Sequence, residues 1–347
     1  MDTPEPSPAE MPTTTAEARL WHSAASTMPF GIVLVDPEGH TLYRDVEAKF
    51  GAESLNQRIL LDRAIATLLH DPAAHGDVER AVELFGPPRR TFLVRRTWLD
   101  DRGQLILVED VSELRRLESV RRDFVANVSH ELKTPVGAIV LLAEALAQED
   151  EPTTAQRLVQ RIVDEGDRLA RLVSDLLDLS RIEEGSGVVL AEFDARSLVE
   201  AVRERFDETA RRADLTLDAL VPVTPTMVVG DRWQLESALS NLVDNAIKYS
   251  EPGGTVEISL DASDDTIVLA VRDEGIGIPA RDRERIFERF YRVDAARSRA
   301  TGGTGLGLSI VRHVVENHRG RLNVTSMEGV GSTFELRLPR GGPNDGR

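Results

Sequence analysis

The stretch "FVANVSHELKTP" at residues 124–135 decides how the middle of the chain folds. On a helix that turns 100° per residue, eight apolar positions between 124 and 146 fall within an arc of about 120°, and His130 falls opposite the middle of that arc. The eight positions are Phe124, Val125, Val128, Leu132, Val136, Ile139, Leu142 and Leu146. The pattern therefore predicts an amphipathic helix that displays the imidazole of His130 to water.

His130 and the adjacent Glu131 allow two interpretations. An exposed imidazole is mostly uncharged near neutral pH and keeps a free lone pair, so it can act as a nucleophile. Glu131 could take or orient the proton on the second ring nitrogen. The alternative is an ordinary surface histidine beside a solvated glutamate, and it would hold if the chain carried no phosphate donor.

The surrounding sequence predicts a pair of long helices. No glycine or proline interrupts residues 112–134, and apolar periodicity resumes after Pro135, so we expect one helix from about Ser112 that kinks at Pro135 without ending there. A second helix follows the gap "QEDEPTT", with apolar residues at spacings of seven: Ile162, Leu169 and Leu176, then Leu172 and Leu179. Two such hairpins make a four-helix bundle, which favours a homodimer. The alternative is that this seam packs on another domain of the same chain.

The sequence before this hairpin predicts a small α+β domain. "FGIVLVDPEGHTLYRD" reads as a β-hairpin, residues 55–70 as a helix, and "RTFLVRRTWL" and "QLILVEDV" as two further strands of an antiparallel sheet. The Pro- and Thr-rich lead at residues 1–20 is expected to be disordered. Among the seven histidines, those at positions 22, 40, 70 and 75 are interpreted as surface residues and not as cofactor ligands.

Composition narrows the class of protein. The 347 residues include 42 basic and 59 acidic side chains, a net charge of −17, which disfavours a nucleic-acid partner. The absence of cysteine excludes disulfides and thiolate chemistry. No signal peptide and no apolar run of the roughly 18 residues that span a bilayer is found. The chain as given is expected to be cytoplasmic, with membrane contact only if the true N-terminus lies upstream and carries transmembrane helices.

From about residue 195 to 339, long helices alternate with strands, which predicts an α/β sandwich whose sheet is covered by helices on one face. Within it, "NLVDNAIKYS" places Asn241, Asn245 and Lys248 on one helix face. Amide oxygens can complete the shell of a magnesium ion that also holds phosphates, and lysine can donate to phosphate oxygens. By itself this face could equally be solvated surface.

Two glycine-rich segments point the same way. In "VRDEGIGIP", Asp273 ends a strand before Gly275 and Gly277, and a fixed carboxylate there could select a base through its exocyclic amine, although a plain acidic turn is the alternative. "TGGTGLGLSIVRHVV" places four glycines before an apolar helix, an arrangement that offers bare N–H groups to phosphate. Residues 292–304 could close over a nucleotide as a lid, with Phe287, Phe290 and Tyr291 as its anchors.

Taken together, these motifs resemble those of bacterial two-component sensor histidine kinases. "FVANVSHELKTP" looks like the H-box, "NLVDNAIKYS" the N-box, "DEGIGIP" and "TGGTGLGLSIV" the glycine boxes, and "RIFERFYR" the F-box, all in the family's order over residues 112–340. The upstream domain is similar to a PAS sensor domain, and the whole most resembles actinobacterial phosphate-responsive sensor kinases.

The resemblance implies a multidomain α+β architecture. A disordered lead (1–20) would precede a PAS-like sensor domain (21–111), a dimerisation and histidine phosphotransfer hairpin (112–186), a GHKL-type ATP-binding domain (187–340) and a tail (341–347).

The resemblance also implies roles for residues. ATP and Mg²⁺ would bind the last domain. The residues implied to bind the nucleotide are Asn241, Asn245 (through Mg²⁺), Lys248, Tyr249, Asp273, Gly275, Gly277, Gly303, Thr304, Gly305, Leu306 and Gly307. His130 would be the phosphoacceptor, Glu131 the general base, and Thr134 would position water for dephosphorylating the partner. That partner would be the receiver domain of a response regulator, phosphorylated on aspartate.

Other functions stay open from the sequence. The chain could be a catalytically weak ATP-binding scaffold controlled by the PAS-like domain, although the presence of His130, Asn245 and Asp273 argues against this. It could be another ATPase with the same nucleotide fold, such as a chaperone or a DNA-repair protein, against which the H-box helix argues. A fourth possibility is that the principal function is ligand binding by the PAS-like domain, with little catalysis.

Overall fold

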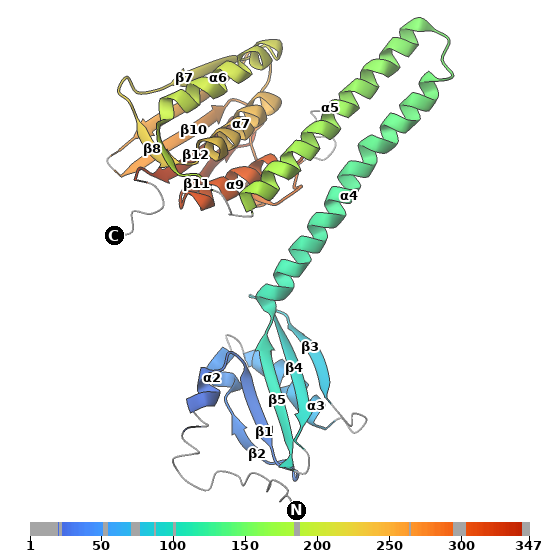
Figure 1. Cartoon of the computed structure of the whole chain (residues 1–347), viewed down its shortest axis with the longest axis vertical. Coiled ribbons are helices and arrows are strands. Elements are labelled where there is room, and N and C mark those ends of the chain that lie inside the picture. The colour runs from blue at the N-terminus through green and yellow to red at the C-terminus, as the bar shows by residue number, and fades with distance from the viewer. Residues whose placement is uncertain are drawn as a thin grey trace, which may run out of the picture. The chain divides into compact units, whose positions relative to one another are not determined.

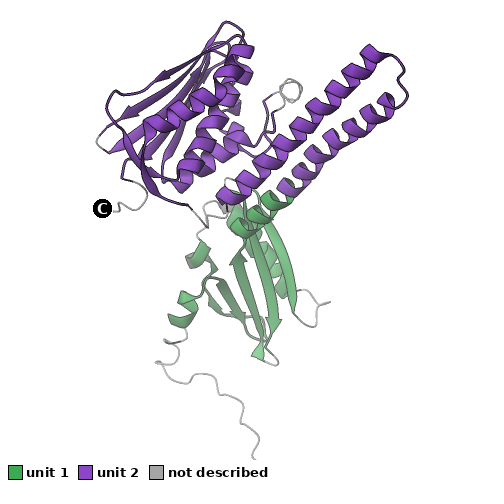
Figure 2. Ribbon diagram, turned by 45° about the horizontal axis from the view of Figure 1, so that its top comes forward, with its two compact units in different colours: residues 1–123 green, residues 124–347 purple. Residues whose placement is uncertain are grey.

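The computed structural model describes residues 20, 23–50, 55–70, 77–86, 88–99, 102–183, 188–263, 265–293 and 303–341. The chain forms two compact units, residues 1–123 (unit 1) and residues 124–347 (unit 2) (Figure 2). Nearly all of the predicted lead, most of the predicted lid (294–302), residues 342–347 of the tail and the histidines at 22 and 75 lie outside the described residues.

Unit 1 is built on a five-stranded antiparallel sheet (Figure 1). Its elements are β1 (Gly31–Val35), β2 (Thr41–Arg44), α2 (Val46–Phe50), α3 (Leu55–Leu69), β3 (Val78–Leu84), β4 (Arg90–Trp98) and β5 (Gln104–Asp110), with the strands in the order β2-β1-β5-β4-β3. The predicted hairpin, helix and two further strands are confirmed. β3 was not predicted from the sequence.

Alternation along the strands of unit 1 explains its core. Val33 on β1, Val94 on β4 and Ile106 on β5 are buried, and they cluster with Ile65 and Leu68 of α3. Alternate residues of a strand point to opposite faces, so one face of this sheet carries the apolar side chains that α3 covers. Unit 1 therefore has a hydrophobic core of its own.

Two long helices follow. α4 runs from Ser112 to Leu146 and α5 from Pro152 to Glu183. α4 continues through Pro135, as the sequence predicts, and the boundary between the two units falls inside this helix. In unit 2, α4 and α5 form an antiparallel hairpin (Figure 1).

The rest of unit 2 is the predicted α/β sandwich. Its elements are β6 (Ala191–Asp194), α6 (Ala195–Arg212), β7 (Thr216–Leu220), β8 (Met227–Gly230), α7 (Arg232–Tyr249), β9 (Thr255–Ala262), β10 (Thr266–Asp273), the 3₁₀ turns η2 (Ala280–Asp282) and η3 (Arg285–Phe287), α9 (Gly307–Asn317), β11 (Arg321–Met327) and β12 (Gly331–Pro339). The main sheet has the order β11-β12-β10-β9-β7, and β6 pairs with β8 in a small second sheet.

Helices α6, α7 and α9 cover one face of the main sheet (Figure 1). β9 and β10 alternate buried and less buried residues, and the buried set, such as Ile258 and Leu269, packs with Leu239 of α7 and Val311 of α9. Aspartates begin two of these helices: the carboxylates of Asp194 and Asp231 accept backbone N–H groups in the first turns of α6 and α7.

The C-terminal half of α5 belongs to the same core. Leu172, Leu179 and Ile182 are almost fully buried and pack in the core cluster of the sandwich. The side-chain amide of Asn317 on α9 donates to the carbonyl of Ile182 at 3.1 Å. For this half of the seam, the alternative weighed from the sequence is therefore the correct one, because the seam packs on the α/β domain of its own chain.

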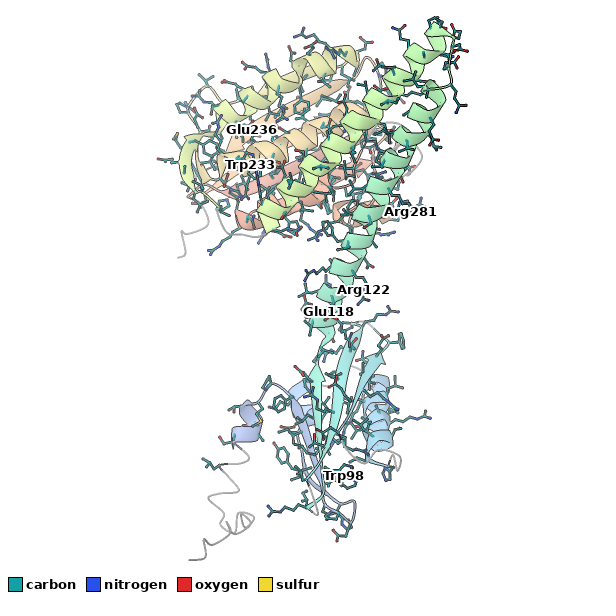
Figure 3. The ribbon with its side chains drawn as sticks, turned by 45° about the vertical axis from the view of Figure 1, so that its right-hand side comes forward. Trp98, Glu118, Arg122, Trp233, Glu236 and Arg281 are labelled. Atoms are coloured by element: carbon teal, nitrogen blue, oxygen red, sulfur yellow. The ribbon has the colours of Figure 1, made fainter. Side chains whose placement is uncertain are left out.

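Each unit exposes a tryptophan. Trp98 ends β4 in unit 1 and is 41% exposed, whereas Trp233 lies in the first turn of α7 in unit 2 and is 43% exposed (Figure 3). Among the described residues, no helix combines the length and the apolar character that crossing a bilayer requires.

Candidate active site

A pocket beside α7 gathers most of the predicted nucleotide residues; it is called the α7 pocket below. Ten of the twelve predicted residues line it, and Gly275 and Leu306 do not. The ten are Asn241, Asn245, Lys248, Tyr249, Asp273, Gly277, Gly303, Thr304, Gly305 and Gly307. The motifs come from α7, from the end of β10 and from the start of α9, so the fold brings together segments that are far apart in the sequence.

The predicted helix face of α7 supplies one wall of the pocket. Lys248 forms an ion pair with Asp244 one turn earlier, and both line the pocket. The amide of Asn241 donates to the carbonyl of Ser237 at 2.9 Å. Among the described residues, the amide of Asn245 takes part in none of the hydrogen bonds, so its oxygen is available to a ligand.

Asp273, at the end of β10, also lines the pocket. It is 8% exposed, and its Oδ1 accepts the backbone N–H groups of Gly275 at 2.9 Å and Ser332 at 3.2 Å. Burial raises the pKa of the Asp273 carboxyl, and the two hydrogen bonds oppose that shift. Both bonds use Oδ1, so Oδ2 can accept a donor from a ligand in the pocket.

Apolar side chains line the pocket as well. They are Ile276, Ile278, Ile286 and Phe334. A polar acceptor set among apolar side chains fits a flat heterocycle that carries an amine, because the apolar walls hold the ring and the carboxylate selects the substituent.

Glycine is required at two positions of the pocket wall. Gly305 has φ +74° and approaches Phe290 so closely that a Cβ would lie 2.9 Å from its backbone. A Cβ on Gly307 would lie 2.5 Å from Oδ1 of Asn241. The second glycine-rich segment therefore reaches α7 only because it lacks side chains there. The first backbone N–H groups of α9 have no partner within the helix, so the glycine-rich segment before it is suited to bind a phosphate.

His130 lies on α4, as the sequence predicts. It is exposed, and it lines a cavity with Asn127, Glu131 and residues 288–291, called the His130 cavity below. Thr134, one turn later, is also exposed and donates its hydroxyl to the carbonyl of His130 at 3.1 Å. The imidazole therefore stands clear of the apolar packing.

Glu131 is held by two arginines. Nη2 of Arg292 donates to its carboxylate at 3.0 Å, and Nη2 of Arg168 on α5 lies 3.7 Å away. The Arg292 side chain is only 9% exposed. In this arrangement the carboxylate beside His130 is engaged by guanidinium groups from α5 and from the segment after η3.

The segment "RIFERFYR" links the two cavities. Tyr291 lines both the α7 pocket and the His130 cavity, and Arg292 lines the α7 pocket while it contacts Glu131. Phe290 packs against Phe124 of α4 with ring centroids 5.9 Å apart. Phe290 thus packs α4 beside the pocket, and Tyr291 is fixed by donating to Asp282 at 2.7 Å. The role predicted for these aromatics, as anchors of a lid, concerns a segment that lies mostly outside the described residues.

Three charged residues of the α7 pocket were missed from the sequence, Arg171, Asp175 and Asp244, and Arg292, which also lines it, was predicted only as the first residue of the lid. Asp244 stands four residues before Lys248, so helical spacing could have found it. Arg292 directly follows the F-box aromatics. Arg171 and Asp175 come from α5, and no local signal places that helix against the pocket.

Comparison with known proteins agrees with this geometry. The family described as "His Kinase A (phospho-acceptor) domain" matches residues 120–185, and "Histidine kinase-, DNA gyrase B-, and HSP90-like ATPase" matches residues 230–342. "Sensor-like histidine kinase SenX3" of Mycolicibacterium smegmatis is 42% identical over 93% of this chain and 86% of its own length. "Phosphate regulon sensor protein PhoR" of Pseudomonas aeruginosa is 39% identical over 69% of this chain and 54% of its own length.

A solved structure shows the same fold. Histidine kinase ThkA, in complex with response regulator protein TrrA, matches 92% of this chain and 98% of its own chain, with a TM-score of 0.52 and 21% sequence identity.

Proposed function

The chain belongs to the sensor histidine kinases of two-component systems, and we propose that His130 is the residue that it phosphorylates, from ATP bound in the α7 pocket. The observation that carries this proposal is the position of His130, which is exposed on α4 and lines a cavity that shares Tyr291 with the α7 pocket. A nucleophile that is accessible beside a nucleotide-shaped pocket is what phosphoryl transfer to histidine requires.

The residues of the α7 pocket fit a nucleotide triphosphate. Oδ2 of Asp273 would accept the amine of adenine between the apolar walls. Lys248 and the backbone N–H groups of residues 303–307 would face the phosphates. The unbonded amide oxygen of Asn245 would bind Mg²⁺, which neutralises phosphate charge when it is present.

We assign the proton chemistry to the pair at 130–131. A ring nitrogen of His130 would form a bond to the γ-phosphorus while the bond to the β,γ-bridging oxygen breaks, and ADP leaves. The proton on the other ring nitrogen would pass to Glu131. Because Arg292 and Arg168 now hold Glu131, the transfer requires that these contacts loosen first.

The phosphoryl group would then pass to an aspartate of a response regulator. Support comes from the ThkA structure, whose partner is a response regulator. Thr134, exposed one turn after His130, would position the water that hydrolyses the phosphorylated aspartate of the response regulator. The name of the related PhoR protein supports phosphate supply as the signal, with the unit 1 sheet as a PAS-like sensor domain.

We further propose that the chain forms a homodimer through its helical hairpin. Exposed apolar residues form a stripe on each helix: Val125, Val136 and Val140 on α4, and Val159, Val163, Val173 and Leu177 on α5. At 100° per residue each stripe stays within about 80° of arc. Two such stripes on one hairpin match what a second hairpin would cover in a four-helix bundle.

The phosphoacceptor is tested by labelling. Purified protein is incubated with γ-labelled ATP and Mg²⁺, and the label is tested for stability in acid and in alkali. A phosphoramidate is lost in acid and survives alkali, so we expect acid-labile label on the wild-type chain and none on His130→Gln.

His40→Gln is the matched control, because His40 is also exposed and lies in unit 1. It should label like the wild-type chain. Label that survives acid, or that persists in His130→Gln, would contradict the assignment.

A further inference from the structure

A carboxylate from the dimerisation hairpin reaches into the α7 pocket. Asp175 on α5 lines the pocket, and its Oδ2 accepts the hydroxyl of Thr304 at 2.6 Å. Thr304 belongs to the glycine-rich segment that precedes α9, and its Oγ1 also accepts the backbone N–H of Leu306 at 3.3 Å. Asp175 therefore contacts the segment whose backbone is suited to bind phosphate.

The position of Asp175 is fixed by packing. Leu172, Leu176 and Leu179 lie three, one and four residues from it and pack in the core of the sandwich, so Asp175 is on the docked face of α5. Beyond it, Glu183 pairs with Arg289 at 2.6 Å. The backbone that carries Asp175 is therefore held against the pocket while this half of α5 stays docked.

Among the residues that the structure describes, no cation lies at ion-pair distance from the Asp175 carboxylate. Lys248, the nearby amine, pairs instead with Asp244. Burial raises the pKa of the Asp175 carboxyl, and the Thr304 hydrogen bond and the charge of Lys248 oppose the shift. A second negative group beside Thr304 would therefore meet the negative charge of Asp175 at short range.

We propose that Asp175 sets the affinity of the α7 pocket for nucleotide phosphates, by competing with them for Thr304 and by repelling their charge, so that docking of α5 and binding of ATP oppose each other. This inference rests on the proposed binding of ATP in the α7 pocket. The coupling is reciprocal, because a group that weakens ATP binding in the docked state makes bound ATP weaken the docking by the same factor.

Asp175→Asn tests the charge alone. Asparagine has nearly the same shape and its Oδ1 can still accept from Thr304, so the fold and the hydrogen bond are kept. The affinities for ATP, ADP and adenosine are measured by titration calorimetry with Mg²⁺, in the His130→Gln background to prevent turnover. We expect Asp175→Asn to bind ATP about 5-fold more tightly, the scale of about 1 kcal/mol for a partly buried like-charge contact. Adenosine, which carries no phosphate, should bind equally to both proteins.

Asp178→Asn is the matched control. Asp178 lies three residues further along α5, is also half-buried, and burial likewise raises its pKa, but it does not line the α7 pocket. Its substitution should leave the ATP affinity unchanged. Unchanged or weaker ATP binding by Asp175→Asn, or an equal gain for adenosine, would overturn the proposal.

Hydrogen exchange gives an independent readout of the docking. ATP should speed amide exchange in residues 172–183 of the His130→Gln chain, and it should do so less when Asp175 is also asparagine. Slower exchange on adding ATP would contradict the opposition between docking and binding. If the chain with aspartate at 175 binds no ATP at all, the proposed nucleotide site fails; if it binds but Asp175→Asn changes nothing, only the role of Asp175 fails.

Discussion

At the scale of single residues, the neighbours His130 and Glu131 differ in their freedom. The imidazole is exposed, whereas the carboxylate is held by Arg292 and Arg168. A carboxylate that pairs with two guanidinium groups must leave at least one of them before it can turn toward another partner. In this arrangement the proposed phosphoacceptor is accessible, whereas the proposed general base is engaged in ion pairs.

Glu131→Gln tests the general base. Glutamine can still accept from Arg292 but cannot take the histidine proton, and general-base catalysis contributes about 10²–10⁴-fold. We expect the initial rate of label incorporation to fall by about 100-fold, with the ATP affinity unchanged within about 2-fold. Rapid-quench labelling and calorimetry measure the two quantities.

Glu144→Gln is the control for that prediction, since Glu144 is exposed on the same helix and outside both cavities. It should leave the rate unchanged. A wild-type rate in Glu131→Gln would mean that water or another group takes the proton.

Local motifs predicted the contents of the α7 pocket because each motif is short and carries its own geometry. A Cβ on Gly307 would lie 2.5 Å from Oδ1 of Asn241. Each of these two residues belongs to a motif that can be recognised in the sequence by itself. The contacts of Arg292 and Arg168 with Glu131 could not be predicted in this way. Arg292 stands 161 residues from Glu131, and Thr304 stands 129 residues from Asp175, so only the packing of α4 and α5 brings these pairs together.

At the scale of elements, the end of α9 is tied to the start of α7 by a buried histidine. His318 is 2% exposed; its Nδ1 lies 2.7 Å from the carbonyl of Val314, and its Nε2 accepts the backbone N–H of Asp231 at 2.9 Å. These partners require the neutral ring with the proton on Nδ1. Burial lowers the pKa of His318, with the carbonyl of Val314 and the charge of Asp231 opposing the shift.

The sign of the pH dependence follows from that pKa. In the unfolded chain the ring takes up a proton as the pH falls through about 6.5, whereas in the folded chain it stays neutral to lower pH. The unfolded state then binds more protons, so the contribution of His318 to stability is present at pH 7 and is lost as the pH falls toward 5.

His318→Gln is expected to lower the free energy of unfolding by about 1–3 kcal/mol at pH 7, because buried hydrogen bonds are lost. The difference in unfolding free energy between the variant and the wild-type chain should be smaller at pH 5 than at pH 7. Urea unfolding of unit 2 at pH 7, 6 and 5 measures this. A difference in unfolding free energy between the two proteins that stays constant from pH 7 to pH 5 would contradict the buried neutral ring.

The strands that the sequence did not reveal have weak patterns. β3 reads "VERAVEL", in which the adjacent charged residues Glu79 and Arg80 break the apolar alternation; few of its side chains are buried, and it forms the edge of the unit 1 sheet. β6 and β8 are only four residues long, and β11 is the edge strand of the main sheet in unit 2. Edge strands bury few side chains, so hydrophobic alternation, the main sequence signal, is faint there.

At the scale of the whole molecule, the apolar surface of α5 is divided between two uses. Leu172 and Leu179 serve the core of unit 2, while Val163 and Leu177 remain 49% and 56% exposed on another side of the helix. The heptad spacing predicted that α5 has a single apolar seam, packed either in a four-helix bundle or on another domain of the chain. The helix instead carries a docked face and an uncovered stripe, so dimerisation and docking do not compete for the same side chains.

Val163→Glu tests the uncovered stripe as the dimer interface. Burying an unpaired carboxylate among apolar side chains costs several kcal/mol, so the dimer dissociation constant should rise by at least about 100-fold. Sedimentation velocity over a range of concentrations should show twice the mass of one chain for the wild type and a single chain for the variant. Val223→Glu makes the same change at a position that is 95% exposed, between β7 and β8, and should leave the dimer intact. If the Val163→Glu chain stays dimeric, the dimer interface does not include this stripe. If the wild-type chain is monomeric, the proposal of a homodimer is wrong.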